Sequence, residues 1–345
     1  MMAVPSPKRG SRAKTRSTPY VDVAVVGLGA IGAAHVDAAL RAPSTRLAAV
    51  ADVDAARARE IAAKAGCPAF DSLPSLLEGA DVDLVVVATP DALHVEVVQQ
   101  AAAAGKHVLL EKPLATTVED GRTILAAVRE AGVLFTVGHC LRFDPKYVEL
   151  ERRVSAGELG ELATVYARRQ NQVGAVDRLK GRVSSLLFLA VHDIDIINWY
   201  VKSRPVSVYC ASAAKIMRGK GYAVDDVSFT TIRYENGAVG VVESGWLLPP
   251  NYPRTGHFEL VATGSRGVAR LDEFDEGLWV ANETFKHIPL VDRLTPQLQH
   301  MAEAIIHGRE PLVSGEDGYS AMEIALAAEV SAREGRVVEL PLAPA

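Results

Sequence analysis

Apolar runs of strand length alternate with helical patterns over the first 140 residues. Strands are expected at 21–26, 47–51, 83–89, 107–110 and 134–137, and helices at 31–42, 55–65, 94–104 and 118–131. Several runs are continuous in Val, Leu and Ala, which is typical of strands buried on both faces. Because strands and helices alternate along this part of the chain, the pattern predicts an α/β fold with a doubly wound parallel sheet.

After about residue 141 the pattern changes to strand signals that are separated by turns. Helices are expected at 145–156 and 191–201, strands at 206–213, 226–234, 239–245, 258–263 and 268–272, and helices again at 296–307 and 318–334. The pair Asn236-Gly237 is a hairpin signal between two of these strands. We therefore predict an α+β domain with a mostly antiparallel open sheet at 141–345, after a first domain at 20–140.

Residues 1–19 differ from the rest of the chain in composition. They carry five Lys and Arg, no acid and three prolines, which predicts a disordered basic tail. The 345 residues suit two domains, and the net charge of −5 gives no reason to expect nucleic acid. No apolar run is long enough for a membrane span. The three cysteines form neither a disulfide framework nor a zinc pattern, so the cytoplasm is expected.

The strongest chemical signal follows the first expected strand. Gly27, Gly29 and Gly32 form the pattern G-x-G-x-x-G, and the second apolar run ends at Asp52, twenty positions after Gly32. Strand, glycine turn, helix, strand and acid stand in the order that a dinucleotide-binding Rossmann fold requires. The cofactor contacts expected from this segment are Gly27, Gly29, Ala30, Ile31, Gly32, Asp52 and Val53.

The acid at the end of the second run also bears on the choice of cofactor. The carboxylate of Asp52 can accept hydrogen bonds from ribose hydroxyls and would repel a 2′-phosphate, and no Arg or Lys follows before Arg57. NAD is therefore predicted rather than NADP. Asp54 is either a second ribose contact or the N-cap of the helix at 55–65.

Further motifs follow in a fixed order along the chain. They are Thr89-Pro90 with His94, Glu111-Lys112-Pro113, Arg142-Phe143 and His192-Asp193-Ile194-Asp195. With the glycine motif and His35, they resemble the family of glucose–fructose oxidoreductase, inositol dehydrogenase and the rhizopine-catabolism protein, over about residues 20–340. The resemblance implies a pyridine-nucleotide oxidoreductase acting on a sugar, sugar derivative or cyclitol, assembled as a homodimer or homotetramer through its second sheet. It also implies cofactor contacts from Thr89, Pro90, His94, Glu111 and Lys112.

Two residues of these motifs have the chemistry of a dehydrogenase. Lys112 follows the C-terminal end of an expected parallel strand, where it can stabilise a developing alkoxide. His192 begins an expected helix, and its imidazole can exchange a proton near neutral pH. We predict that both are catalytic, and the sequence leaves open which is the base. Asp193 and Asp195 fall in the first helical turn, where one can orient His192 and the dipole favours both. The resemblance implies a cis bond before Pro113.

One position departs from the family pattern. That pattern carries an acid four residues before the histidine, and here Phe188 stands in its place. A phenyl ring cannot share a proton, so the Lys–Asp–His triad becomes a Lys–His pair and a less polar substrate contact is expected. Tyr166, Asp177 and Asp225 are other sources of a phenol or carboxylate. The predicted substrate contacts are His139, Arg142, Phe188, Asp193 and Trp246, although Trp246 is equally suited to a protein core.

These observations predict an NAD-dependent dehydrogenase that oxidises one secondary hydroxyl of a sugar, amino sugar, glycoside or cyclitol. A reductase of a keto-sugar in secondary metabolism is an alternative, and so is a non-catalytic NAD-binding regulator with the same fold. The nine histidines include no His-x-His or His-Glu-x-x-His pattern, so no metal is expected.

Overall fold

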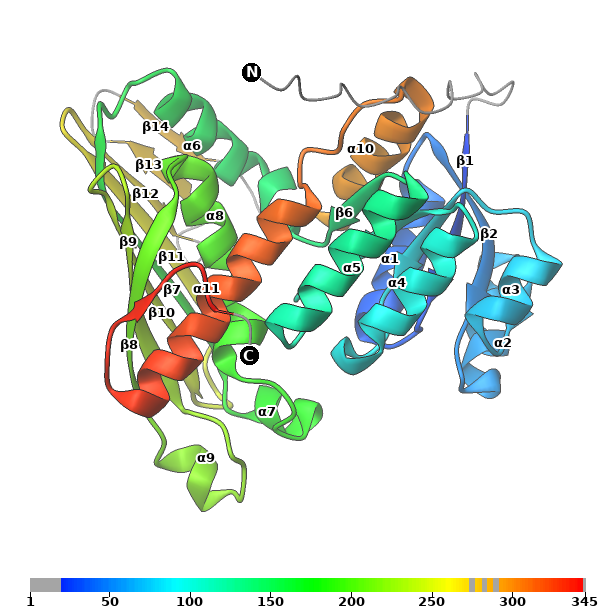
Figure 1. Ribbon diagram of the computed structural model, residues 1–345, viewed down its shortest axis with the longest axis horizontal. Coiled ribbons are helices and arrows are strands. Elements are labelled where there is room, and N and C mark those ends of the chain that lie inside the picture. The colour runs from blue at the N-terminus through cyan, green and yellow to red at the C-terminus, as the bar shows by residue number, and fades with distance from the viewer. Residues whose placement is uncertain (1–19, 273–276, 281–283, 288–291, 344–345) are drawn as a thin grey trace, which may run out of the picture.

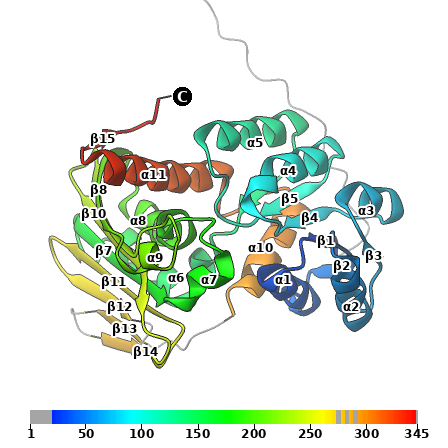
Figure 2. The same ribbon diagram turned by 90° about the horizontal axis from the view of Figure 1, so that it is seen from below.

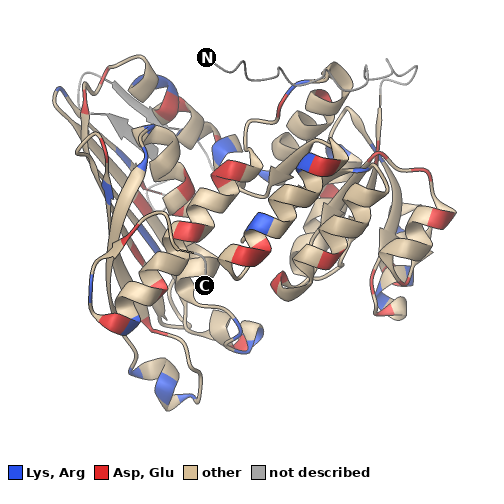
Figure 3. Cartoon of the chain, viewed as in Figure 1, with Lys and Arg blue, Asp and Glu red and all other residues tan. Residues whose placement is uncertain are grey.

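The computed structural model describes residues 20–272, 277–280, 284–287 and 292–343, so the predicted tail at 1–19 lies outside the described residues. Two sheets with their helices lie side by side (Figures 1 and 2). No helix in the described ranges is long and apolar enough to cross a membrane. Charged side chains of both signs are spread over both halves of the chain (Figure 3).

The first sheet has six parallel strands in the order β3-β2-β1-β4-β5-β6. Its strands are β1 (Val21–Val26), β2 (Thr45–Ala51), β3 (Ala69–Phe70), β4 (Leu84–Val87), β5 (His107–Leu110) and β6 (Phe135–Val137). The helices are α1 (Ala30–Arg41), α2 (Ala55–Ala65), α3 (Leu73–Gly79), α4 (His94–Ala103) and α5 (Val118–Ala131). The predicted doubly wound parallel sheet is confirmed. The sequence pattern missed β3 and α3, which are short.

The second sheet has nine strands in the order β14-β13-β12-β11-β7-β10-β9-β8-β15. Its strands are β7 (Leu162–Gln172), β8 (Pro205–Ala213), β9 (Val227–Tyr234), β10 (Val239–Leu248), β11 (Gly256–Gly264), β12 (Val268–Asp272), β13 (Gly277–Val280), β14 (Thr284–His287) and β15 (Val338–Glu339). All neighbours pair antiparallel except β7 and β10, which are parallel. The predicted mostly antiparallel sheet is therefore confirmed, and Asn236-Gly237 forms the turn between β9 and β10.

Helices cover one face of this second sheet (Figure 1). They include α6 (Pro145–Ser155), α8 (Val191–Val201) and α11 (Gly315–Glu334), and the short helices are α7 (Gly174–Leu179) and α9 (Ile216–Gly219). Helix α11 begins three residues before its predicted start, because Ser314 and Asp317 form a capping box. A π-helical turn, η3 (Leu186–Ala190), runs directly into α8.

Helix α10 (Leu294–His307) packs on the first sheet, not the second. Its Leu298, Met301 and Ala302 share an apolar cluster with side chains of β1 and α1. The prediction assigned everything after residue 140 to the second domain, whereas this late helix completes the core of the first. The spacing of apolar residues along α10 does not indicate which of the two sheets this helix packs against.

Candidate active site

The loop between β1 and α1 has space for a ligand at its middle glycine. Gly27 has φ +86°, and a Cβ there would lie 2.6 Å from the Ala88 carbonyl oxygen. A Cβ on Gly32 would collide with the Gly27 carbonyl, whereas one on Gly29 would meet no atom within 4 Å. Helix α1 has no side-chain cap, so its first N–H groups are left for an anion. The loop therefore fits the pyrophosphate of a dinucleotide.

The Asp52 carboxylate holds this loop in place. Its Oδ2 accepts a hydrogen bond from the Leu28 N–H at 2.6 Å, and its Oδ1 accepts one from the Asp54 N–H at 2.8 Å. Asp54 in turn accepts from the N–H groups of Ala56 and Arg57. Of the two roles predicted for Asp54, the structure thus shows the N-cap. The guanidinium of Arg57, which is half exposed, lies 3.5 Å from Asp52.

Two exposed apolar side chains flank the loop. Ile31 in the first turn of α1 is 41% exposed, and Val53 after β2 is 91% exposed. Because the two side chains stand on either side of the glycine loop, they suit contact with the planar base of a bound dinucleotide. Ala30, at the start of α1, is exposed as well.

His94 was predicted to contact the cofactor, and the structure corrects this. Its ring is fully buried, with Nε2 3.2 Å from the Thr89 carbonyl oxygen and Nδ1 3.1 Å from that of Pro113. The ring thus ties the loop after β4 to the loop after β5. Thr89 is partly exposed and Pro90 is exposed, so these two residues remain accessible to a ligand.

Glu111 and His35 form a buried pair beneath the same loops. The Nε2 of His35 lies 2.7 Å from Oε1 of Glu111, whose other oxygen accepts from the Lys112 N–H at 3.1 Å. Burial alone would raise the pKa of Glu111, but the hydrogen bond and charge of His35 and the charge of Lys112 outweigh it and hold that pKa below its usual range. Glu111 therefore positions the Lys112 backbone. The Lys112–Pro113 peptide is cis, as the resemblance implied.

The Lys112 side chain reaches across to the second half of the chain. Its Nζ donates to the carbonyl oxygen of Phe188 at 2.9 Å and lies 4.1 Å from the centre of the Phe188 ring. Burial lowers the pKa of Lys112, and the charge of Glu111 partly opposes this shift. The ammonium is thus held between a carbonyl and an aromatic face.

The helix predicted at 191–201 is confirmed as α8, but its N-terminus beside His192 is not free. The π-helical turn η3 precedes α8 without a break, and Val191 N–H bonds to the carbonyl of Leu186, five residues back. Asp193 and Asp195 are therefore not at a free helix N-terminus, and the predicted dipole role is wrong. Burial, followed by the charges of Lys112 and Arg169, lowers the pKa of His192 well below its usual value.

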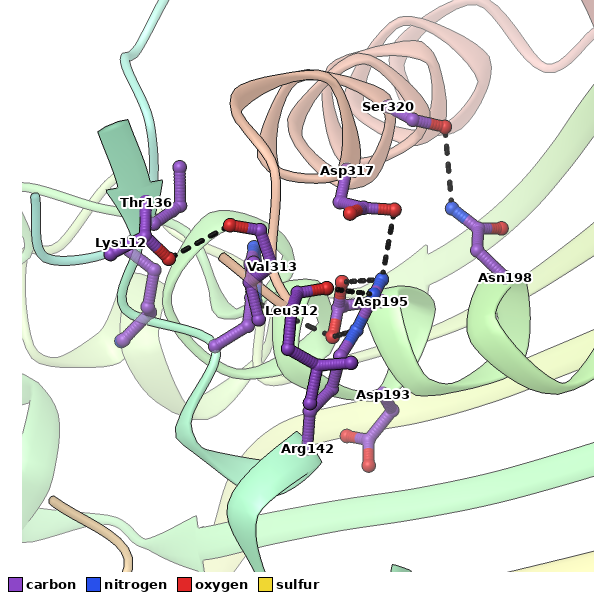
Figure 4. A network of polar contacts seen from close by, with 12 residues as sticks. Lys112, Thr136, Arg142, Asp193, Asp195, Asn198, Leu312, Val313, Asp317 and Ser320 are labelled. Carbon is purple, nitrogen blue, oxygen red and sulfur yellow. Dashed lines mark hydrogen bonds and ion pairs between the residues drawn. The ribbon is translucent and has the colours of Figure 1, made fainter. Parts of the chain in front are cut away.

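The two acids after His192 are instead fixed in buried ion pairs, and Figure 4 shows the one that Asp195 forms with Arg142. Asp195 receives two hydrogen bonds from Arg142, at 2.9 and 2.6 Å, and Arg142 also lies 3.1 Å from Asp317. Asp193 receives two from Arg169, at 2.6 and 2.9 Å. Arg142 and Asp193 were predicted to contact substrate, but both are almost fully buried and have their charges paired within the protein.

The aromatic side chains of Phe188 and Trp246 are in contact, and only the first is accessible to solvent. Phe188 is partly exposed, whereas Trp246 is fully buried behind it, with ring centroids 5.6 Å apart. Trp246 packs with residues such as Val176 and Met217 in a separate apolar cluster. The core role of Trp246 is thus the one observed, because a buried ring offers no face to a sugar. His139 is also buried, with both ring nitrogens inaccessible, so it too cannot touch substrate.

Several residues that shape the site were not predicted. Arg169 lies on β7, whose run of Arg, Gln and Asn hides the alternation of a strand. Asp317 is more than a hundred residues away in sequence from its partner Arg142, and His35 was indicated only by the family motif.

Tyr166 and Asp177, which were considered as other sources of a phenol or carboxylate, are bonded within the second half of the chain. Tyr166 donates to Glu243 at 2.8 Å, and Asp177 accepts hydrogen bonds from Lys220 and Tyr222. Within the described part of the chain, no three His, Cys, Asp or Glu side chains are grouped as metal ligands.

Comparisons with known proteins match both halves of the chain. Residues 21–139 match the family described as "Oxidoreductase family, NAD-binding Rossmann fold", and residues 147–270 match the "GFO/IDH/MocA C-terminal domain". The chain is 29% identical to scyllo-inositol 2-dehydrogenase (NAD(+)) of Bacillus subtilis, over 93% of this chain and 96% of that protein. It is 32% identical to inositol 2-dehydrogenase 2 of Saccharopolyspora erythraea, over 94% and 96%. The crystal structure of an oxidoreductase domain protein from Kribbella flavida superposes with a TM-score of 0.85 at 26% identity, covering 94% of this chain and all of that one.

Proposed function

Because the chain belongs to the GFO/IDH/MocA oxidoreductase family, we propose that it transfers a hydride between NAD and one secondary hydroxyl of a sugar, amino sugar, glycoside or cyclitol. Two relatives that act on inositols support a polyol substrate. Reduction of a keto-sugar is the same reaction in reverse.

The observation that carries this proposal is the junction of Lys112 with the turn that leads to His192. Lys112 comes from the end of a strand of the first sheet, and Phe188 stands four residues before His192. The hydrogen bond between Lys112 and Phe188 joins the two segments, and the Lys112 charge is among those that lower the pKa of His192. A cation and a neutral imidazole are therefore available to one substrate hydroxyl.

The cofactor-binding residues follow from the glycine loop. Gly29 and the first N–H groups of α1 take the pyrophosphate, Asp52 takes the adenosine ribose, and Ile31 and Val53 flank the base. NAD, when bound, accepts or returns the hydride. A buried carboxylate at Asp52 supports NAD over NADP, because a 2′-phosphate would be repelled.

The roles of the two proposed catalytic residues differ. His192 stays neutral at pH 7, so its accessible nitrogen, Nε2, can take the proton of the substrate hydroxyl. Lys112 donates a hydrogen bond to the same oxygen as negative charge develops on it. Phe188 forms the wall beside Lys112, which favours a substrate with an apolar group at that point.

We propose that NAD binds to residues 20–140, whose core is completed by α10, and that the rest of 141–345 binds substrate and self-associates. Tyr209 on β8 and Phe229 on β9 are exposed and alternate with buried neighbours, so they lie on the sheet face turned away from the core, which supports a homodimer or homotetramer formed there. Phe229→Glu should dissociate the oligomer in sedimentation, and an unchanged mass would contradict this interface.

A substrate screen tests the proposed activity. The purified protein is mixed with NAD and a panel of inositols, sugars, amino sugars and glycosides, and the absorbance of reduced nicotinamide is followed. We expect turnover with at least one polyol, and turnover that is at least about a hundredfold slower with Lys112→Ala. Tight NAD binding without any turnover would instead identify a non-catalytic regulator.

A further inference from the structure

Three buried ring nitrogens without a hydrogen-bond partner lie close together beside the proposed base. They are Nδ1 and Nε2 of His139 and Nδ1 of His192, three of only nine such side-chain atoms in the described part of the chain. An unpaired polar atom in a protein interior carries a desolvation penalty, so an arrangement of this kind calls for a partner. Among the residues that the structure describes, none supplies a hydrogen-bond partner to any of the three nitrogens.

The geometry of the two rings defines what that partner can be. The ring centroids lie 6.4 Å apart and the planes are nearly perpendicular, at 88°. Each nitrogen lies about 1.2 Å from the centre of its ring, so the nearest nitrogens of the two rings are at least roughly 4 Å apart, which is too far for a direct hydrogen bond of about 3 Å. One water molecule that bonds to a nitrogen of each ring bridges roughly 4–6 Å between the two nitrogens, and the separation of the rings allows such a bridge.

His139 also lies near the buried ion pair of Arg142 with Asp195. Its Nδ1 lies 4.0 Å from Oδ2 of Asp195, and Asp195 is itself held by Arg142. His139, which is 1% exposed, therefore neighbours both the Asp195 carboxylate and the ring of His192.

We propose that His139 is a positioning residue for His192, and that a buried water molecule between the two rings orients the imidazole and conducts its proton. This inference rests on the proposed function. In oxidation, Nε2 of His192 takes the proton of the substrate hydroxyl while Nδ1 gives its own proton to the water. The water passes a proton to His139, so His192 ends neutral and the charge resides on His139 beside Asp195.

The charges around the two rings favour transfer in that direction. Burial is the main cause of the lowered pKa of His192. The nearby charges of Lys112, Arg169, His139 and Arg293 lower that pKa further. Burial also lowers the pKa of His139, as do Arg142 and Lys112, but the carboxylates of Asp195 and Asp317 act against the shift. Carboxylates thus favour a proton on His139, whereas the main charges that act on His192 are all cationic. This arrangement supplies the charge stabilisation that Phe188 cannot provide.

The test compares His139→Phe, which keeps a ring but removes both nitrogens, with His139→Gln, which can still bond a water molecule. His257→Phe, on β11, is the matched control. In the wild type we expect a solvent isotope effect with more than one proton in motion. In His139→Phe we expect kcat to fall roughly tenfold to a hundredfold while KM stays unchanged. The solvent isotope effect of this variant should indicate a single proton in motion. His139→Gln should recover part of kcat, and the control should match the wild type.

A second readout needs neither substrate nor cofactor. The ring proton signals of His192 are titrated by NMR in the free protein, where protonation of His139 should perturb them in the wild type and not in His139→Phe. Coupled titration of the two rings would support the proton path between His192 and His139 even if no polyol were turned over. Failure of the proposed function can therefore be distinguished from failure of this inference. Independent titration of the two rings, or a wild-type kcat in His139→Phe, would overturn the proposal.

Discussion

Lys112 is anchored to Phe188 in two ways at once. Its Nζ donates to the Phe188 carbonyl oxygen at 2.9 Å and lies 4.1 Å from the centre of the Phe188 ring. One residue follows a strand of the first sheet, and the other lies in the π-helical turn before α8. The proposed site therefore exists only where the two halves of the chain meet.

Replacing Lys112 by Ala should reduce turnover by at least about a hundredfold, because its hydrogen bond to the substrate oxygen strengthens in the transition state. NAD affinity should stay within a factor of a few. Steady-state kinetics and equilibrium titration measure the two effects. Lys64→Ala, which removes an exposed lysine on α2, serves as the control. Near wild-type turnover in Lys112→Ala would remove the residue from the mechanism.

Asp52 and Asp54 provide a matched pair for the cofactor site. Asp52→Ala should weaken NAD binding by about 1.5–3 kcal/mol, the value of a hydrogen bond to a charged group. Asp54→Ala should lower the unfolding free energy through the lost N-cap, with little effect on NAD affinity. Calorimetric titration with NAD and NADP measures the affinities, and denaturant titration measures the change in unfolding free energy. Tighter binding of NADP by the wild type would refute the stated preference.

Phe188→Asp should lower activity on the native substrate. A carboxylate at this position would lie beside the Lys112 ammonium, so it would neutralise the charge that is meant for the substrate oxygen, and it would uncover Trp246. Phe188→Leu, which keeps an apolar wall, should retain more activity. A severalfold increase in kcat/KM for Phe188→Asp would show that the ring impairs a mechanism of the inositol dehydrogenase type.

Arg142→Met should cost about 3–5 kcal/mol of unfolding free energy, because it leaves the buried carboxylate of Asp195 unpaired. Arg129→Met removes an exposed ion pair with Glu316 and should cost less than about 1 kcal/mol. Denaturant titration measures both. Equal effects of the two substitutions would mean that the buried pair contributes no more than a surface pair.

The rate of oxidation should depend on pH through His192. Burial, then Lys112 and Arg169, lower its pKa well below 6.5, so the imidazole is already neutral at pH 6.5 and above. We therefore expect kcat/KM to be unaffected by this group above pH 6.5 and to decline only well below it. His192→Asn should abolish the decline together with most of the activity. A midpoint at or above pH 7 would contradict the assignment of His192 as the base.

The parts of the site that could be predicted from the sequence are those specified by local signals. The glycine pattern, the acid at Asp52 and the strand before Lys112 all lie within short, well-spaced segments, and the structure has them as expected. Arg142 and Asp193 were misassigned because their roles depend on partners far away in the chain. One partner, Arg169, lies on a polar strand, and a carbonyl of the π-helical turn accepts from Lys112. No local pattern marks either feature.

The position of α10 has a consequence for biosynthesis. Strand β1 leaves the ribosome early, but the apolar surface that it shares with α1 stays uncovered until Leu298 and Met301 have been made. For most of translation, the nascent chain therefore exposes an incomplete core, which is the kind of surface that chaperones bind and that promotes aggregation. A gene fragment that encodes only the first sheet lacks this covering helix, so a minimal nucleotide-binding module would need α10 grafted back onto it.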